Sequence, residues 1–241
     1  MKYIVGNWKC NPETLIGAKN ILLGYKKGIK KSVKAKAVVC PPACYLGLAK
    51  EVLKGMVALG GQNCHWEPKG AFTGEISPTQ LKNTGCGYVV VGHSERRQIF
   101  GETSEMINKK IKAALAAGLT PIFCCGETRE QRIDGKITEV VEAQIKEGLK
   151  DIDLITAPVM IAYEPVWAIG TGQACSPQEA KVVSQFIKNI LNEKIPLLYG
   201  GSVNATNAAS YLTEAGYDGL LVGGASLDPK AFGAIFEVAK K

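Results

Sequence analysis

Eight short apolar runs recur along the chain and alternate with segments of helical periodicity. The runs are Tyr3–Gly6, Ala37–Cys40, Val57–Gly60, Tyr88–Val91, Thr120–Cys124, Val159–Tyr163, Pro196–Tyr199 and Gly219–Val222. The helical segments between them include Glu105–Ala117, Thr138–Leu149, Pro177–Leu191 and Asn204–Ala215. Runs that are apolar on both faces suit parallel strands covered by helices. Eight such units favour a closed eight-stranded parallel (β/α)8 barrel over an open doubly wound sheet.

The length of the chain fits one such barrel. It has 241 residues, and no linker-like tract divides it, so we expect residues 1–241 to form a single catalytic domain. Hydrophobic residues make up 46% and charged residues 21%, which excludes a disordered, collagen-like or coiled-coil protein.

The charge balance and the cysteine content limit the kinds of ligand and partner that we expect. The 29 basic against 22 acidic residues give a net charge of +7, but no basic stripe is visible, so we expect small anionic ligands and no nucleic acid. The apolar runs are too short for a membrane span or a secretory leader, which predicts a cytoplasmic protein without membrane attachment. Eight dilute cysteines without paired C-x-x-C spacing predict reduced thiols and no metal.

Polar residues follow the predicted strands at the end where barrels carry their active sites. Asn7 and Lys9 follow the first run, His93 and Glu95 the fourth, and Glu164 the sixth. Glycine-rich turns follow the last two runs, at Gly200–Ser202 and Gly223–Gly224. The sequence therefore predicts one rim crowded with chemically active groups.

Seven motifs, in this order along the chain, resemble those of a known family. They are GNWK at 6–9, GAFTGE at 70–75, VGHSERR at 91–97, CGE at 125–127, AYEPVWAIGTG at 162–172, YGGSV at 199–203 and LVGGAS at 221–226. With these motifs the chain resembles the triosephosphate isomerase family from end to end. The resemblance implies a TIM barrel that interconverts dihydroxyacetone phosphate and D-glyceraldehyde 3-phosphate through an enediolate. This aldose–ketose isomerase reaction belongs to glycolysis and gluconeogenesis and needs no cofactor.

Proton transfer between adjacent carbons needs a base and an electrophile shielded from water. Glu164 lies between apolar residues that would raise its basicity, so we predict it to be the base. His93 opens a short helix whose N–H groups disfavour a second proton, which predicts a neutral imidazole donor. The plainer alternatives are a capping glutamate and a structural histidine.

Lys9 and Asn7 would support this chemistry. Lys9 carries a fixed positive charge that can reach the substrate's oxygens, and Asn7 beside it is a neutral donor. The resemblance implies that Glu95 holds Lys9 by charge pairing. A simple acidic residue in the first turn of a helix is the alternative for Glu95.

The phosphate has no lysine-bearing P-loop, so backbone amides must supply its donors. We expect Gly170, Ser202, Gly223 and Gly224 to bind it, with Gly223–Gly224 opening a short helical turn. A lid is predicted over the substrate from Pro165, Val166, Trp167, Ala168, Ile169, Gly170, Thr171 and Gly172. Gln173 follows the lid where the family usually has lysine, which leaves the lid's kinetics open.

The segment Asn63–Glu75 is long for a loop and presents Phe72 and Thr73 near its tip. Such apolar exposure predicts a covering partner. The resemblance implies a homodimer in which this loop lies beside the neighbour's catalytic asparagine and lysine. We therefore expect Cys10, directly after Lys9, to lie under the partner's Phe72–Thr73 loop.

Two other functions remain open from the residues alone. One is another phosphate-binding barrel enzyme, such as an aldolase that forms a Schiff base through Lys9. The other is a non-catalytic binder of phosphorylated metabolites or nucleic acid on the same barrel. Retention of Asn7, Lys9, His93 and Glu164 argues against lost activity.

Overall fold

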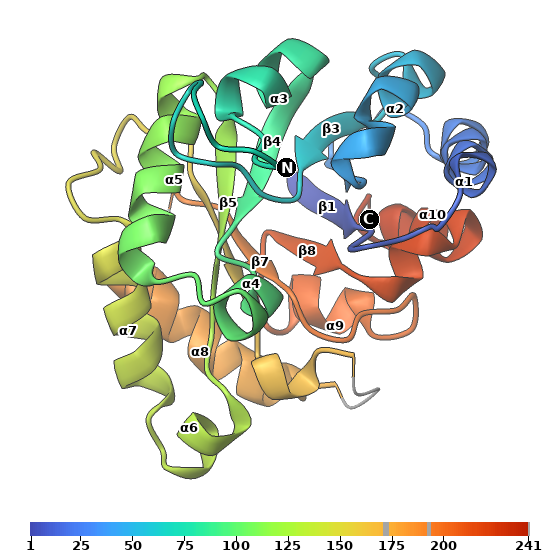
Figure 1. Ribbon diagram of the computed structural model, residues 1–241. Helices are drawn as coiled ribbons and strands as arrows, with labels where there is room; N and C mark the ends of the chain where they lie inside the picture. Colours follow the sequence, from blue (N-terminus) through green and yellow to red (C-terminus); the bar gives the residue numbers. More distant parts are fainter. Residues whose placement is uncertain (171–173, 192–193, 241) are drawn as a thin grey trace.

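Eight parallel strands close into a barrel in sequence order, with β1 paired to both β2 and β8, which confirms the predicted fold class (Figure 1). The computed structural model describes residues 1–170, 174–191 and 194–240. The strands are β1 (Lys2–Asn7), β2 (Ala35–Cys40), β3 (Ala58–Gly61), β4 (Cys86–Val91), β5 (Thr120–Cys125), β6 (Met160–Tyr163), β7 (Leu197–Tyr199) and β8 (Gly219–Val222).

Helices cover the outside of this barrel (Figure 1). The α-helices are α1 (Leu15–Gly28), α2 (Leu46–Leu53), α3 (Pro78–Thr84), α4 (Ser94–Ile99), α5 (Ser104–Ala116), α6 (Arg129–Ile133), α7 (Ile137–Gly148), α8 (Pro177–Ile190), α9 (Ala208–Thr213) and α10 (Pro229–Val238). Three 3-10 turns add η1 (Ala43–Tyr45), η2 (Val166–Ala168) and η3 (Gly224–Leu227). None of the helices in the described ranges is long and apolar enough to cross a membrane.

One predicted helix is shorter than its periodicity suggested. The segment Asn204–Ala215 was expected to be helical, but α9 begins only at Ala208. The side-chain oxygen of Asn204 accepts hydrogen bonds from the backbone N–H groups of Thr206 and Asn207, at 2.9 and 3.1 Å. These bonds close a turn that competes with the first helical turn.

The core has two parts, because successive residues of a strand point to opposite faces. Side chains inside the barrel form one cluster, which includes Val5, Val38, Val90, Ile122 and Leu198. The larger cluster lies between the strands and the surrounding helices. The barrel is therefore filled with side chains, and no pore runs through it.

Glycines allow neighbouring strands to approach Glu164 closely. The backbone N–H of Glu164 donates to the carbonyl of Cys125 at 2.8 Å, which brings the end of β6 against the end of β5. A Cβ at Gly126 would lie 1.8 Å from the carbonyl oxygen of Glu164, and one at Gly200 would lie 2.9 Å from its Cγ. The ends of β5 and β7 thus leave a narrow space around Glu164, which exists only because the residues there are glycines. We call this space the glycine slot.

Candidate active site

A hollow of about 260 Å³ opens at the carboxyl ends of the strands. We call it the catalytic hollow. Its lining residues come from the carboxyl ends of β1 and β8 and from the loops after β1, β4, β6, β7 and β8, so the hollow gathers residues that are far apart in sequence. They include Asn7, Lys9, His93, Glu164, Ile169, Gly170, Ser202, Leu221, Gly223 and Gly224. All the residues predicted to act on the substrate or its phosphate line this hollow, with the exception of Glu95.

The backbone of Lys9 is held in an unusual conformation. Its φ of 53° lies in the left-handed region, which is uncommon for a residue with a side chain. The side-chain oxygen of Asn7 accepts a hydrogen bond from the Lys9 N–H at 3.0 Å, and Gln62 Nε2 donates to the Lys9 carbonyl at 2.9 Å. These contacts fix the strained backbone and hence the origin of the lysine side chain. No sequence motif predicts this role for Gln62.

The ammonium group of Lys9 is paired with a carboxylate. Lys9 Nζ lies 2.6 Å from Oε1 of Glu95, although both side chains are partly exposed. A Schiff base would require the amine to be free to attack a carbonyl carbon, whereas here Lys9 Nζ is engaged by Glu95. The pairing therefore suits electrostatic stabilisation of an anion rather than nucleophilic attack.

His93 caps helix α4, and this contact selects its tautomer. Nδ1 of His93 accepts a hydrogen bond from the backbone N–H of Glu95 at 3.2 Å. A nitrogen that accepts carries no proton, so Nε2 holds the hydrogen of the imidazole. Nε2 lies 3.2 Å from Oε1 of Glu164, and both residues line the catalytic hollow.

The carboxylate of Glu164 is almost completely buried, with 2% of the residue exposed. Its Oε2 accepts a hydrogen bond from the backbone N–H of Ser94 at 2.9 Å, while Oε1 faces His93 Nε2. Both oxygens are thus engaged by the start of α4. A substrate that takes the hydrogen bond of His93 would release one oxygen of Glu164 to accept a proton.

A second buried carboxylate supports the segment after Glu164. Both oxygens of Glu127 accept from the Tyr163 hydroxyl, at 3.1 and 3.0 Å, and Oε1 also accepts from Trp167 Nε1 at 3.0 Å. Burial and the charge of Glu127 raise the pKa of Tyr163 well above its ordinary value. In the sequence Glu127 stands only as part of the CGE motif at 125–127, which predicts neither a role for it nor its contact with Trp167.

A buried thiol lies beneath the carboxylate. Burial and the negative charge of Glu164 raise the pKa of Cys124 well above its ordinary value. Cys124 therefore stays protonated and unreactive at neutral pH.

The residues predicted to bind the phosphate lie in turns. Gly223 precedes the 3-10 turn η3, and its carbonyl accepts from both the backbone N–H and the hydroxyl of Ser226, at 2.8 and 2.6 Å. Gly170 and Ser202 line the same hollow. Among the described residues no group of three or more His, Cys, Asp or Glu side chains could hold a metal ion.

The predicted lid is described as far as Gly170. Val166, Trp167 and Ala168 form the 3-10 turn η2, and Ile169 and Gly170 line the catalytic hollow. The remaining predicted lid residues, Thr171 and Gly172, and the hinge residue Gln173 lie outside the described residues.

A second hollow, of about 360 Å³, adjoins the catalytic hollow. We call it the socket. Its lining includes Cys10 together with Asn7, Lys9, His93 and Glu95, so the two hollows share catalytic candidates. Cys10 is exposed in the single chain.

Phe72 and Thr73 are also exposed, on the loop between β3 and α3. The ring of Phe72 packs against His65 with a centroid distance of 4.3 Å, and 42% of Phe72 remains exposed. The tip of this loop is thus ordered against its own chain and still presents apolar surface.

Known proteins match this sequence over almost its whole length. The sequence profile described as triosephosphate isomerase matches residues 2–239. Triosephosphate isomerase of Aquifex aeolicus (strain VF5) is 46% identical over 97% of this chain and 98% of its own length. That of Synechocystis sp. (strain ATCC 27184 / PCC 6803 / Kazusa) is 45% identical over 96% of both chains.

A solved structure gives the same result. The crystal structure of triosephosphate isomerase from Bartonella henselae superposes with a TM-score of 0.89 at 36% sequence identity. The match covers all of this chain and 99% of that one.

Proposed function

The chain belongs to the triosephosphate isomerase family, and from this premise we propose which of its residues carry out the reaction. The enzyme interconverts dihydroxyacetone phosphate and D-glyceraldehyde 3-phosphate, and no finding favours a Schiff-base aldolase or a non-catalytic binder. The observation that carries the proposal is the meeting of Lys9, His93 and Glu164 around one hollow.

Glu164 is the base. Its buried carboxylate removes a proton from one carbon of the bound triose phosphate, and the same group returns a proton to the adjacent carbon. The enediolate formed between these steps carries negative charge on its oxygens. Hydrogen bonds from water would make the carboxylate a weaker base. The low exposure of Glu164 keeps water away and so supports this role.

His93 and Lys9 stabilise the enediolate, and Asn7 assists them. The hydrogen on His93 Nε2 faces Glu164 in the free enzyme and can be donated to a substrate oxygen in the hollow instead. Lys9 contributes positive charge, and Glu95 holds its ammonium group in position through the ion pair. Both donors are fixed before substrate binds, so little reorganisation accompanies the proton transfer.

The substrate's phosphate binds at the turns of the hollow. Backbone N–H groups of Gly170, Ser202, Gly223 and Gly224 are the proposed donors, since these residues line the hollow. The segment Pro165–Gly172 serves as the lid that excludes water from the enediolate.

The active unit is a homodimer of one-domain subunits, with residues 1–241 acting as a single catalytic domain. The socket of one subunit receives the Phe72–Thr73 loop of the other, which supports Lys9, a residue that lines both the socket and the catalytic hollow. Exposure of both surfaces in the single chain supports this proposal. Because its substrates belong to central carbon metabolism, we propose a cytoplasmic location.

Solvent isotope exchange tests the proposed mechanism directly. Incubation of dihydroxyacetone phosphate with the enzyme in deuterium oxide should introduce deuterium at the carbon from which Glu164 abstracts the proton. A borohydride arm should trap no covalent adduct. Isomerisation without deuterium incorporation, or a trapped adduct at Lys9, would contradict the proton-transfer mechanism.

A further inference from the structure

A separate pocket lies at the other end of the barrel, far from the chemistry. It has a volume of about 290 Å³, and we call it the basal pocket. Its walls come from the connection between α1 and β2, the connection between α2 and β3, and helix α10. These connections lead into the amino ends of strands, whereas the catalytic hollow lies at their carboxyl ends.

The polar groups of the basal pocket are almost all cationic. Lys30, Lys31 and Lys36 line it together with the hydroxyl-bearing Ser32, and none of its lining residues is acidic. In the part of the chain that the structure describes, no carboxylate forms an ion pair with any of these three ammonium groups. Lys36 Nζ lies 5.2 Å from the centroid of the Tyr88 ring, an attraction that a phosphate group can add to. Three cations without a carboxylate partner at one pocket favour a ligand with several negative charges.

The rest of the pocket is apolar. Met56 and Phe236 line it beside small residues at the starts of β2 and β3. Phe236 is a buried core residue that closes the floor of the pocket through the packing of α10, and the accessible apolar surface comes from Met1 and Met56. An apolar wall beneath a cationic rim matches a ligand with an apolar body and a charged end.

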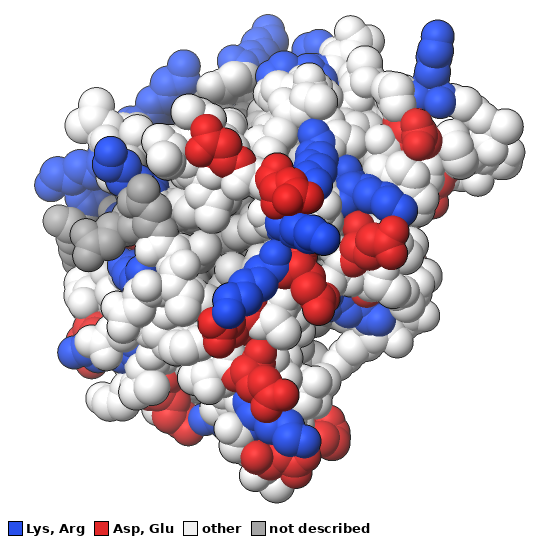
Figure 2. Space-filling model, turned by 90° about the vertical axis from the view of Figure 1, so that its left-hand side faces the viewer, with Lys and Arg blue, Asp and Glu red and all other residues white. Residues whose placement is uncertain are grey.

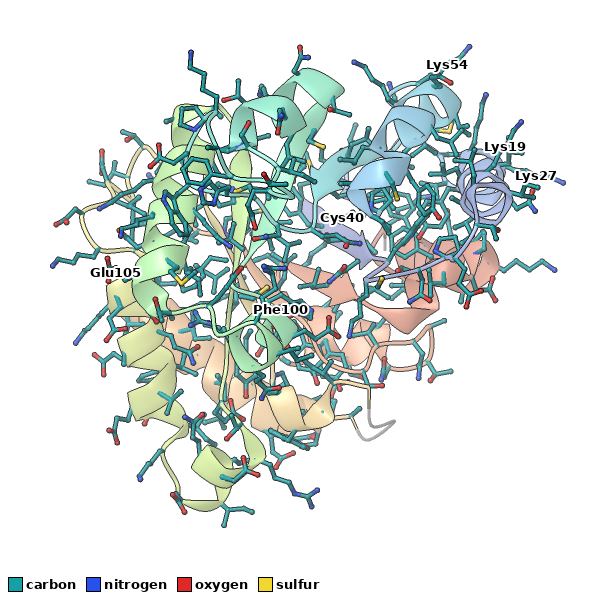
Figure 3. The ribbon with its side chains drawn as sticks, viewed as in Figure 1. Lys19, Lys27, Cys40, Lys54, Phe100 and Glu105 are labelled. Carbon is teal, nitrogen blue, oxygen red and sulfur yellow. The ribbon has the colours of Figure 1, made fainter. Side chains whose placement is uncertain are left out.

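The charge distribution around the basal pocket also favours an anionic ligand. Residues 1–54 contain eleven lysines and only two acidic residues, a net charge of +9, whereas the remaining residues carry 18 basic and 20 acidic groups. The lysines of α1 and α2 extend outward, as Lys19, Lys27 and Lys54 show in Figure 3. The whole excess charge of the protein therefore lies in the quarter of the barrel that holds the basal pocket.

The opposite side of the molecule differs. Figure 2 shows basic and acidic side chains lying next to one another there. On α5 and α7, Lys109 pairs with Glu105 and Lys146 with Glu142, each at 2.7 Å. Lysines on that face are thus paired with neighbouring carboxylates, whereas, among the residues that the structure describes, the lysines of the basal pocket are not.

We propose that the basal pocket binds an organic polyphosphate, meaning two or more linked phosphate groups on an apolar body such as a nucleoside. The ammonium groups of Lys30, Lys31 and Lys36 contact the phosphates, and the wall formed by Met1 and Met56 contacts the apolar body. The site is independent of catalysis, because it shares no lining residue with the catalytic hollow.

Calorimetric titration of the full chain with ATP, and with inorganic tripolyphosphate as a comparator, tests the proposal. The isomerase active site is first saturated with inorganic phosphate. ATP should bind with sub-millimolar affinity at low salt, several times more tightly than tripolyphosphate, and should raise the melting temperature. Binding should weaken at least about tenfold in 0.5 M KCl, because screening weakens contacts with exposed ammonium groups. Equal binding of the two compounds would overturn the role of the apolar wall, and salt-independent binding would overturn that of the lysines.

A matched pair of variants locates the site. The triple variant Lys30→Gln, Lys31→Gln, Lys36→Gln removes the three cations of the pocket. The control variant Lys19→Gln, Lys26→Gln, Lys27→Gln removes the same charge from exposed positions on α1. The first should lose affinity for ATP about tenfold or more, and the second should change it about twofold at most. Equal losses in both variants would mean diffuse attraction without a site, and no loss in the first would place the binding elsewhere.

Discussion

The hydroxyl of Tyr211 donates a hydrogen bond of 2.5 Å to the carbonyl oxygen of Cys175, just beyond the predicted lid. The Tyr211 ring stacks on Tyr199 with a centroid distance of 3.9 Å, which fixes the direction of that hydroxyl. Helix α9 thereby holds the chain at the point where the lid segment leads into α8.

We predict that Tyr211→Phe alters catalysis through the lid. Loss of the hydrogen bond frees the Cys175 carbonyl and should increase the escape of the enediolate, measured as methylglyoxal formed per isomerisation. The control is Tyr217→Phe, because the Tyr217 hydroxyl donates to the Ala180 carbonyl inside α8. Both variants should lose about 1 kcal/mol of unfolding free energy, but only the first should form more methylglyoxal. An equal increase in both would indicate a general loss of packing.

Replacing the base should abolish most activity while leaving the fold intact. Glu164→Gln keeps the size of the side chain and removes its basicity, so kcat should fall between about 10² and 10⁴-fold. Glu164→Asp displaces the carboxylate by about an ångström and can still cost on the order of 10²-fold. The measurement is steady-state kinetics combined with deuterium exchange. Near-normal exchange in Glu164→Gln would show that another group removes the proton.

The tautomer of His93 is directly measurable. Because Nδ1 accepts the Glu95 N–H, nitrogen-15 NMR should show the hydrogen on Nε2 in the free enzyme. His93→Gln should lower kcat by about 10²-fold or more through loss of the aligned donor. A hydrogen found on Nδ1 would remove the basis for the proposed electrophile.

Stability should decline in alkaline solution because of buried thiols. Burial raises the pKa of Cys86 to about 11 and that of Cys64, Cys125 and Cys175 to about 12, against an ordinary value of 9.0. Above pH 9 the unfolded chain therefore binds fewer protons than the folded protein, and the free energy of unfolding falls as pH rises. Between pH 8 and 10 each such thiol should cost about 1 kcal/mol.

Denaturant unfolding under reducing conditions measures this loss. Cys86→Ala should show a pH-dependent loss about 1 kcal/mol smaller than that of the unmodified protein, whatever its stability at pH 8. The same pH dependence in both proteins would contradict the contribution of Cys86.

Modification of Cys10 should report on the proposed dimer. A bulky methanethiosulfonate adduct on Cys10 would fill the socket, separate the subunits and displace Lys9, so activity and dimer should be lost together. Sedimentation and activity are followed for the unmodified chain, for Cys10→Ser and for Cys44→Ser, since Cys44 is also exposed. Only Cys10→Ser should resist the reagent. Equal sensitivity of Cys10→Ser would assign the effect to another thiol.

The barrel could be predicted from the sequence because each strand is a separate apolar run, and helical periodicity fills the intervals. The end of β6 and the start of α4 also followed from local motifs, and the structure brings Glu164 and His93 together as neighbours on the rim. The error at α9 arose because the side-chain bonds of Asn204 override a helical pattern that continues through it.

Other features depend on contacts between segments that are far apart in sequence. Gln62 supports Lys9 across 53 positions, and Glu127 meets Trp167 across 40 positions. Periodicity carries no information on such contacts. The basal pocket depends likewise on α10 packing against connections from the first quarter of the chain, and only the folded chain shows that three lysines share it.

The glycine slot around Glu164 also limits how this enzyme can evolve. A methyl group at Gly126 would fall 1.8 Å from the Glu164 carbonyl oxygen, so even alanine would push apart β5 and β6 at their carboxyl ends. In a saturation library selected for isomerase activity, position 126 should therefore tolerate no other residue, although its own side chain takes no part in the reaction. New activities on this scaffold would have to arise by changes in the loops, while the geometry at this strand junction stays inherited unchanged.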